Sequence, residues 1–307
     1  MISIDRPFEA ERVSLKLPGA VRLRVRRSES GSTISIRSED ADPQQLSITE
    51  RDGKLRIKTD DRCGRRAEYD VVIDAATPLG LRVAAPKLEL HAEHDLGSVD
   101  LAAATVAVDL DRVADLKMAA KSGHARISEV AGERAFIAAA SADVLIERCY
   151  ASLDTRMGTG DLQVGVLDGP LTARSATGDI ESAWTGADVE VRSGSGAVSL
   201  GVLGDIATWL DLYSGTGHID VDVPPSEPPT DGEPYVAISV ATGTGDIRIY
   251  RAATDDADGD QTGESSTVAA DSADSSDTTG DTTVVIEDDG ATESNKEGDD
   301  DDATGTQ

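Results

Sequence analysis

Three aspartates recur at one position of a repeating pattern and are the residues best suited to bind a cation. Asp143, Asp161 and Asp179 follow one another at equal spacing, each directly after a turn position. If the repeats stack as neighbouring strands, these carboxylates lie about 4.8 Å apart. Unpaired carboxylates at that spacing repel one another, and a bound cation would relieve the repulsion. A structural role fits equally, because aspartate in a turn accepts hydrogen bonds from backbone amides.

A stripe of arginines is the second group with a chemical use. In V-R-L-R-V-R (21–26), Arg22, Arg24 and Arg26 alternate with apolar residues, and Arg27 follows. This alternation places the three arginines on one face of a strand. Such a stripe is either a solvated strand face or a contact for an acidic surface, namely anionic lipid, the chain's own C-terminal region or a neighbouring subunit.

The remaining reactive residues indicate no catalytic centre. His91 and His94 are three apart in a segment that reads as a strand, so they face opposite sides and do not share a metal. Cys63 and Cys149 form neither a metal-binding nor a disulfide spacing. The sequence contains no nucleophile elbow, Walker loop or dinucleotide fingerprint followed by a helix. We therefore predict a protein that is not an enzyme and needs no cofactor.

The elements that must position these residues form an internal repeat. One turn position recurs along the chain, as Gly123, Ala142, Gly160, Gly178, Gly196, Gly217 and Gly245. Apolar residues alternate after each turn, and another apolar pair precedes it, so each repeat supplies two short strands. Stacked repeats place equivalent residues in register and bury a continuous core. The sequence predicts an all-β fold, a parallel β-solenoid with about 18 residues per coil, rather than a sandwich.

Charge and composition divide the chain into three parts. Residues 1–66 carry 15 basic and 11 acidic residues and read as a β segment that caps or begins the repeats. Residues 67–252 hold the solenoid repeats, with a Pro-rich loop inserted at 224–234. Residues 253–307 carry 18 acidic residues and one basic residue, a composition that predicts a disordered acidic tail.

The whole composition limits the partners and the compartment. A net charge of −29 with 3% aromatic residues is a poor match for nucleic acid, which needs basic grooves and stacking rings. The acidic bias resembles that of cytosolic proteins from extreme halophiles, in which high salt screens the self-repulsion. Because neither an apolar signal segment nor a transmembrane segment is recognisable, we predict a cytoplasmic protein.

Several turn motifs resemble those of a known family. They are G-T-G-D-L-Q-V (158–164), A-T-G-D-I (176–180), S-G-S-G-A-V-S-L (193–200) and G-T-G-D-I-R-I (243–249). They are similar to the β-strand-repeat family labelled putative adhesins, a domain of unknown function, over roughly residues 80–252. This resemblance implies a β-helical, non-catalytic domain. The architecture also resembles bactofilins, cytoskeletal β-helices that polymerise end to end without nucleotide.

These observations predict a non-enzymatic, cytoplasmic scaffold protein of a halophile that self-assembles as bactofilins do. The last repeat, at 244–254, shows no cap, and an uncapped solenoid ends in unpaired strands. A monomeric, adhesin-like β-helical module that binds a protein or a glycan is the alternative. A glycan-acting solenoid enzyme is a third reading. The partners expected are other copies of the chain, and a protein or anionic membrane surface at the arginine stripe.

Overall fold

The described part of the chain is built entirely from β-strands. The computed structural model describes residues 2–39, 46–59, 67–204, 206–224 and 235–252. These residues form twenty strands joined in one sheet, with no helix among them, so the prediction of an all-β protein is confirmed. They accordingly include no helix capable of crossing a membrane. The predicted acidic tail and residues 225–234 of the predicted loop lie outside the described residues.

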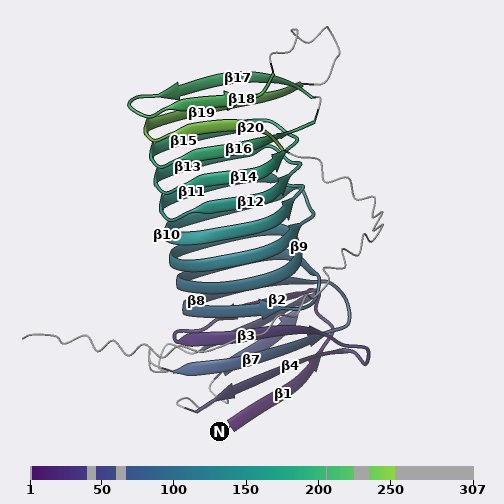
Figure 1. Cartoon of the computed structure of the whole chain (residues 1–307). Coiled ribbons are helices and arrows are strands. Elements are labelled where there is room, and N and C mark those ends of the chain that lie inside the picture. Colours follow the sequence, from purple (N-terminus) through teal and green to yellow (C-terminus); the bar gives the residue numbers. More distant parts are fainter. Residues whose placement is uncertain (1, 40–45, 60–66, 205, 225–234, 253–307) are drawn as a thin grey trace, which may run out of the picture. The chain divides into compact units, whose positions relative to one another are not determined.

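The N-terminal strands mix antiparallel and parallel pairing. They are β1 (Ile2–Phe8), β2 (Arg12–Lys16), β3 (Ala20–Arg27), β4 (Ser32–Ser38), β5 (Leu46–Arg51), β6 (Lys54–Thr59) and β7 (Glu68–Ala75). β4 pairs antiparallel with β1 and β7, and β5 pairs antiparallel with β6. β2 and β3 pair in parallel with successive parts of β8 (Leu79–Ala92). Through β8 the N-terminal strands therefore join the first repeat (Figure 1).

From β8 onward the chain runs through stacked coils. Their strands are β9 (Leu96–Val130), β10 (Arg134–Cys149), β11 (Ser152–Thr159), β12 (Leu162–Leu167), β13 (Leu171–Thr177), β14 (Ile180–Thr185), β15 (Val189–Ser195) and β16 (Val198–Leu203). All their pairings are parallel. Leu153 of β11 pairs with Leu171 of β13, which pairs with Val189 of β15. Equivalent positions of successive repeats thus lie side by side, as in a solenoid.

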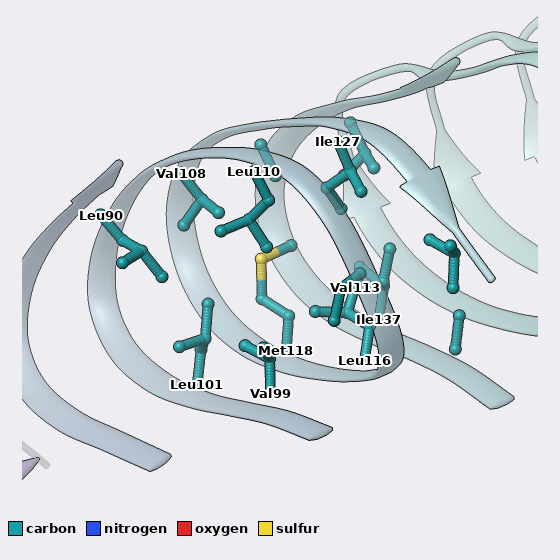
Figure 2. Close-up of a cluster of buried hydrophobic side chains, with 14 of the residues drawn as sticks. Leu90, Val99, Leu101, Val108, Leu110, Val113, Leu116, Met118, Ile127 and Ile137 are labelled. Carbon is teal, nitrogen blue, oxygen red and sulfur yellow. The ribbon is translucent and has the colours of Figure 1, made fainter. Parts of the chain in front are cut away.

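Apolar side chains from both sides of each coil fill its interior. Figure 2 shows Leu110, Met118 and Ile127 pointing into this space, and all three are buried. Along β10, buried residues alternate with outward-facing ones, as the period-two pattern predicts. Full burial of a leucine or isoleucine contributes roughly 1.5–3 kcal/mol. The stacked interior is therefore the main source of stability.

Glycine is required at the turns because adjacent coils touch there through their backbones. Gly160, Gly178 and Gly196 have φ values of 102°, 126° and 131°, where residues with a Cβ are strained. A Cβ added to Gly178 would lie 2.1 Å from the carbonyl oxygen of Gly160. Both the conformation and the close approach therefore exclude a side chain.

The last two coils are stacked in the reverse of their chain order. β17 (Ala207–Ser214) and β18 (Ile219–Asp222) precede β19 (Tyr235–Thr244) and β20 (Ile247–Ala252) in sequence. Yet β19 lies between β15 and β17, and β20 lies between β16 and β18. The coil of β17 and β18 is therefore the end of the stack (Figure 1).

This reversal corrects the expectation that the stack ends at residues 244–254. Residues 244–252 belong to an inner coil, and the uncovered coil is residues 207–222. Twelve residues separate β18 from β19, and a chain of that length can span up to about 40 Å. The segment that reads as an inserted loop is thus long enough to carry the chain back beneath the coil it has just formed.

Candidate functional site

The three predicted cation ligands are brought together in one column. The Oδ1 atom of Asp143 accepts a hydrogen bond from the backbone N–H of Asp161 (3.2 Å), and that of Asp161 accepts from Asp179 (2.8 Å). Asp179 in turn accepts from the backbone N–H of Ala197 (2.7 Å). Each carboxylate therefore fastens the turn of the next coil, which is the structural alternative weighed for these residues. We call this arrangement the aspartate ladder.

The same contact recurs outside the predicted column. Asp246 accepts from the backbone N–H of His218 in the end coil (2.8 Å), and Asp115 accepts from Glu133 and Arg134 (both 3.1 Å). Within the described ranges, no group of three or more His, Cys, Asp or Glu side chains is arranged to hold a metal ion. Through these hydrogen bonds the recurring aspartate contributes to coil stacking.

The predicted arginine stripe lies on the outer face of β3, where its first member is neutralised. Arg22 forms ion pairs with Glu68, Asp70 and Glu89 at 3.9, 4.0 and 3.5 Å. These acids come from the two strands that flank β3, so carboxylates lie on both sides of the guanidinium group. Exposed pairs of this kind contribute little to stability, but they cancel the local charge.

The other stripe residues have mixed surroundings. Arg26 pairs in register with Asp74 of β7, whereas Arg24 lies between an apolar neighbour and His91. Arg27 is exposed at the end of β3. The stripe therefore exists as predicted, but its positive charge is broken up by the adjacent strands.

A second basic surface, which the sequence interpretation missed, lies on β2, β5, β6 and β8. Its outward-facing cations are Arg12, Lys16, Arg51, Lys54, Arg56, Lys58 and Arg82, and we call it the basic face. The signal is present in R-V-S-L-K (12–16) and K-L-R-I-K (54–58), where basic and apolar residues alternate. Only the pairing of these distant segments brings the charges together.

The histidines and the described cysteine are placed as structural residues. His91 is exposed and lies 3.2 Å from Asp109 and 3.1 Å from Glu93, whereas His94 is buried, so the two histidines face opposite sides as predicted. Cys149 is a free thiol in the core, and burial raises its pKa to about 11. Cys63 lies outside the described residues.

The end coil carries most of the exposed large apolar side chains of the described residues. Ile219 and Val221 are 44% and 42% exposed, although they face inward like their buried partners in β20. Trp209, Tyr213 and Tyr235 are 65%, 65% and 55% exposed on one side of the same coil and its neighbour. Exposed large apolar side chains gathered on one coil indicate an interaction site.

The arrangement of the strands defines the class of protein. The described residues form an all-β protein in which parallel strands stack as repeats from β8 onward, with charged outer faces and exposed apolar side chains at the end coil. The model of the Toastrack DUF4097 family matches residues 12–250, so the chain belongs to this family. This match confirms the predicted resemblance to a β-strand-repeat family of unknown function.

Two solved structures illustrate the likeness. A putative adhesin from Bacteroides fragilis is 13% identical, with a TM-score of 0.47 over 81% of this chain and 97% of the other. A putative lipid binding protein from Parabacteroides distasonis is 12% identical, with a TM-score of 0.40 over 81% and 97%. No curated protein matches the sequence.

Proposed function

We propose that this protein is a non-catalytic scaffold module that associates with further copies of itself through the coil at residues 207–222. The observation that carries the proposal is the uncovered core of this coil. Ile219 and Val221 pair in register with Ile247 and Ile249, which are completely buried, yet they remain nearly half exposed. Covering them would remove apolar surface from water, which favours association.

The strands of the end coil also favour a partner made of β-strands. β17 pairs only with β19 and β18 only with β20 among the described strands, so each presents one free edge. A free strand edge is a template for pairing with another chain. A second copy offers a matching edge and the same apolar core, so two end coils can cover each other around a two-fold axis.

Charge sets the condition for this self-association. Asp211, Asp220 and Asp222 are exposed on the end coil, so two such ends bring like charges together. At molar salt the Debye length is about 3 Å, so the repulsion between exposed charges farther apart than this is largely screened. Self-association should therefore strengthen with salt, in line with a cytoplasmic role in a halophile.

A second candidate function rests on the aromatic side of the same coil. Trp209 and Tyr213 face outward on β17, and Tyr235 lies on the neighbouring strand. Exposed aromatic side chains are enriched where proteins bind partners. An adhesin-like module that binds a protein or a glycan through these rings is therefore the alternative.

Substitutions separate the two functions. Ile219→Lys places a charge at the open core and should abolish self-association, whereas Trp209→Ser should spare it and weaken capture of a protein or glycan. Tyr150→Lys, at an aromatic residue 46% exposed in a coil covered on both sides, is the control. Sedimentation velocity in low salt and in molar potassium chloride measures the association. Monomers of the unmodified protein in both salts would exclude self-association and leave the aromatic side as the functional surface.

A further inference from the structure

A hollow of about 250 Å³ opens in the middle of the basic face. It lies over β6, β2, β8 and the start of β9, and four basic side chains surround it: Arg12, Lys54, Arg56 and Arg82. Small residues form its floor, namely Ser14, Gly80 and Ser98. Asp100 also lines the recess, so four cationic side chains, two hydroxyl groups and one carboxylate converge on it.

The recess is open at its floor because residue 80 is a glycine. A Cβ added to Gly80 would lie 2.8 Å from the Cγ atom of Arg12 and 3.4 Å from the Oγ atom of Ser98. Gly80 does not have a positive φ, so its backbone conformation does not require a glycine. Its effect is to keep the space between Arg12 and Ser98 open.

The positive charge around the recess is not neutralised as it is on β3. Arg12 pairs in register with Lys54, and Lys16 with Lys58, so like charges stand directly across neighbouring strands. Such pairs destabilise a sheet. Arg82 forms an ion pair with Asp100 (3.3 Å), but no carboxylate of the described residues lies within 4.0 Å of Arg12, Lys54 or Arg56.

We propose that this recess binds a phosphate ester. Guanidinium groups match the oxygens of phosphate with paired hydrogen bonds, and lysine adds a point charge. Ser14 and Ser98 provide hydroxyl donors on the floor. A bound dianion would also relieve the repulsion between Arg12 and Lys54, so the cost of holding these cations together is offset only when the ligand is present.

The surroundings favour a compact phosphate group over a nucleic acid strand. No aromatic side chain is among the residues that line the recess, so bases would find no ring for stacking. The net charge of −29 repels a long polyanion outside this one face. A second hollow beside the first, lined by Lys16, Lys58 and Pro86 among others, extends the positive surface and leaves room for the remainder of an ester.

Calorimetric titration of the full chain with glycerol phosphate, at ionic strength matched with chloride, tests the site. Arg56→Gln should weaken binding about ten-fold or more, because a charged hydrogen-bonding group is lost. Gly80→Ala should weaken it without any change in charge. Arg174→Gln is the matched control, since it removes one exposed arginine from β13 and should leave binding unchanged.

Vesicles distinguish the source of the phosphate. If the protein floats with phosphatidylcholine vesicles that contain phosphatidic acid, but not with vesicles of phosphatidylcholine alone, the ligand is a lipid headgroup. Binding of glycerol phosphate without flotation assigns the site to a soluble ester, and both results support the proposal. Equal losses in Arg174→Gln and Arg56→Gln would overturn it in favour of diffuse attraction. Binding of single-stranded DNA that is tighter than binding of glycerol phosphate would overturn it as well. So would a calorimetric signal with glycerol phosphate that is no larger than with chloride at the same ionic strength.

Discussion

The covered coils at residues 134–203 and the end coil at residues 207–222 are built from the same repeat but differ in how they are buried. In the covered coils, inward-facing residues such as Leu153 and Leu200 are completely buried. In the end coil, the residues at the equivalent positions are Leu210, which is only partly buried, and Val221, which is 42% exposed. A single coil therefore cannot bury its own core. Stability is a property of the interface between coils, as expected for a one-dimensional array.

Whether a coil is covered on one side or on both also determines whether its apolar side chains stabilise the fold or remain available for binding. Where a coil is covered on both sides, its inward-facing apolar side chains are buried in the core and its outer face is mostly polar. Where a coil is covered on one side, apolar side chains remain available to another molecule. The position of a repeat in the stack thus decides its role, and the reversed order of the last two coils decides which repeat holds that position.

The largest expected effect comes from deleting equivalent core side chains in the two regions. Leu153→Ala should lower the free energy of unfolding by about 2–5 kcal/mol, because a closed cavity remains. Leu210→Ala, at the equivalent position of the end coil, should cost less than about 1 kcal/mol, since water already reaches the site. Urea unfolding followed by circular dichroism, in high salt, measures both values. Equal losses would mean that the end coil is covered in solution.

The aspartate ladder offers a smaller test with the same contact in both regions. Asp161 and Asp246 each accept one backbone hydrogen bond at 2.8 Å, the first from a covered coil and the second from the end coil. Asp161→Ala should destabilise the protein by about 1 kcal/mol. Asp246→Ala should change global unfolding less and speed amide exchange in residues 207–222. Identical effects on unfolding would show that the end coil unfolds together with the rest.

Much of the fold could be predicted because the repeat is local in sequence. The spacing of Asp143, Asp161 and Asp179 reflects the stacking of consecutive coils, so it predicts both the parallel register and their common column. What could not be predicted from the spacing is whether a cation or the backbone satisfies the carboxylates. That choice depends on whether the turns lie close enough for each carboxylate to reach a backbone N–H of the next coil, as they do here at 2.7–3.2 Å.

The features that were missed depend on pairing between distant segments. The basic face exists because β2 lies beside β6, and nothing in residues 12–16 specifies residues 54–58 as neighbours. The reversed end of the stack likewise depends on which of two similar repeats lies against β15 and β16. Period and hydrophobicity are alike in both repeats, so the pattern carries no information on their order.

Thiol reactivity makes the finest distinction between the two regions. Cys149 is completely buried, and burial raises its pKa from an ordinary value near 9 to about 11. In a Cys63→Ser background it should react slowly with iodoacetamide at pH 8, whereas a cysteine introduced by Val221→Cys should react rapidly.

The raised pKa of Cys149 also fixes the sign of a pH effect. Below pH 9 the thiol is protonated in both states, and its contribution to stability is fully present. Between pH 9 and pH 11 the unfolded thiol loses its proton while the folded thiol keeps it, so stability should fall as pH rises. Cys149→Ala should flatten this part of the stability profile measured by urea unfolding. An unchanged slope in that variant would show that burial does not raise the pKa of Cys149 and that another group is responsible.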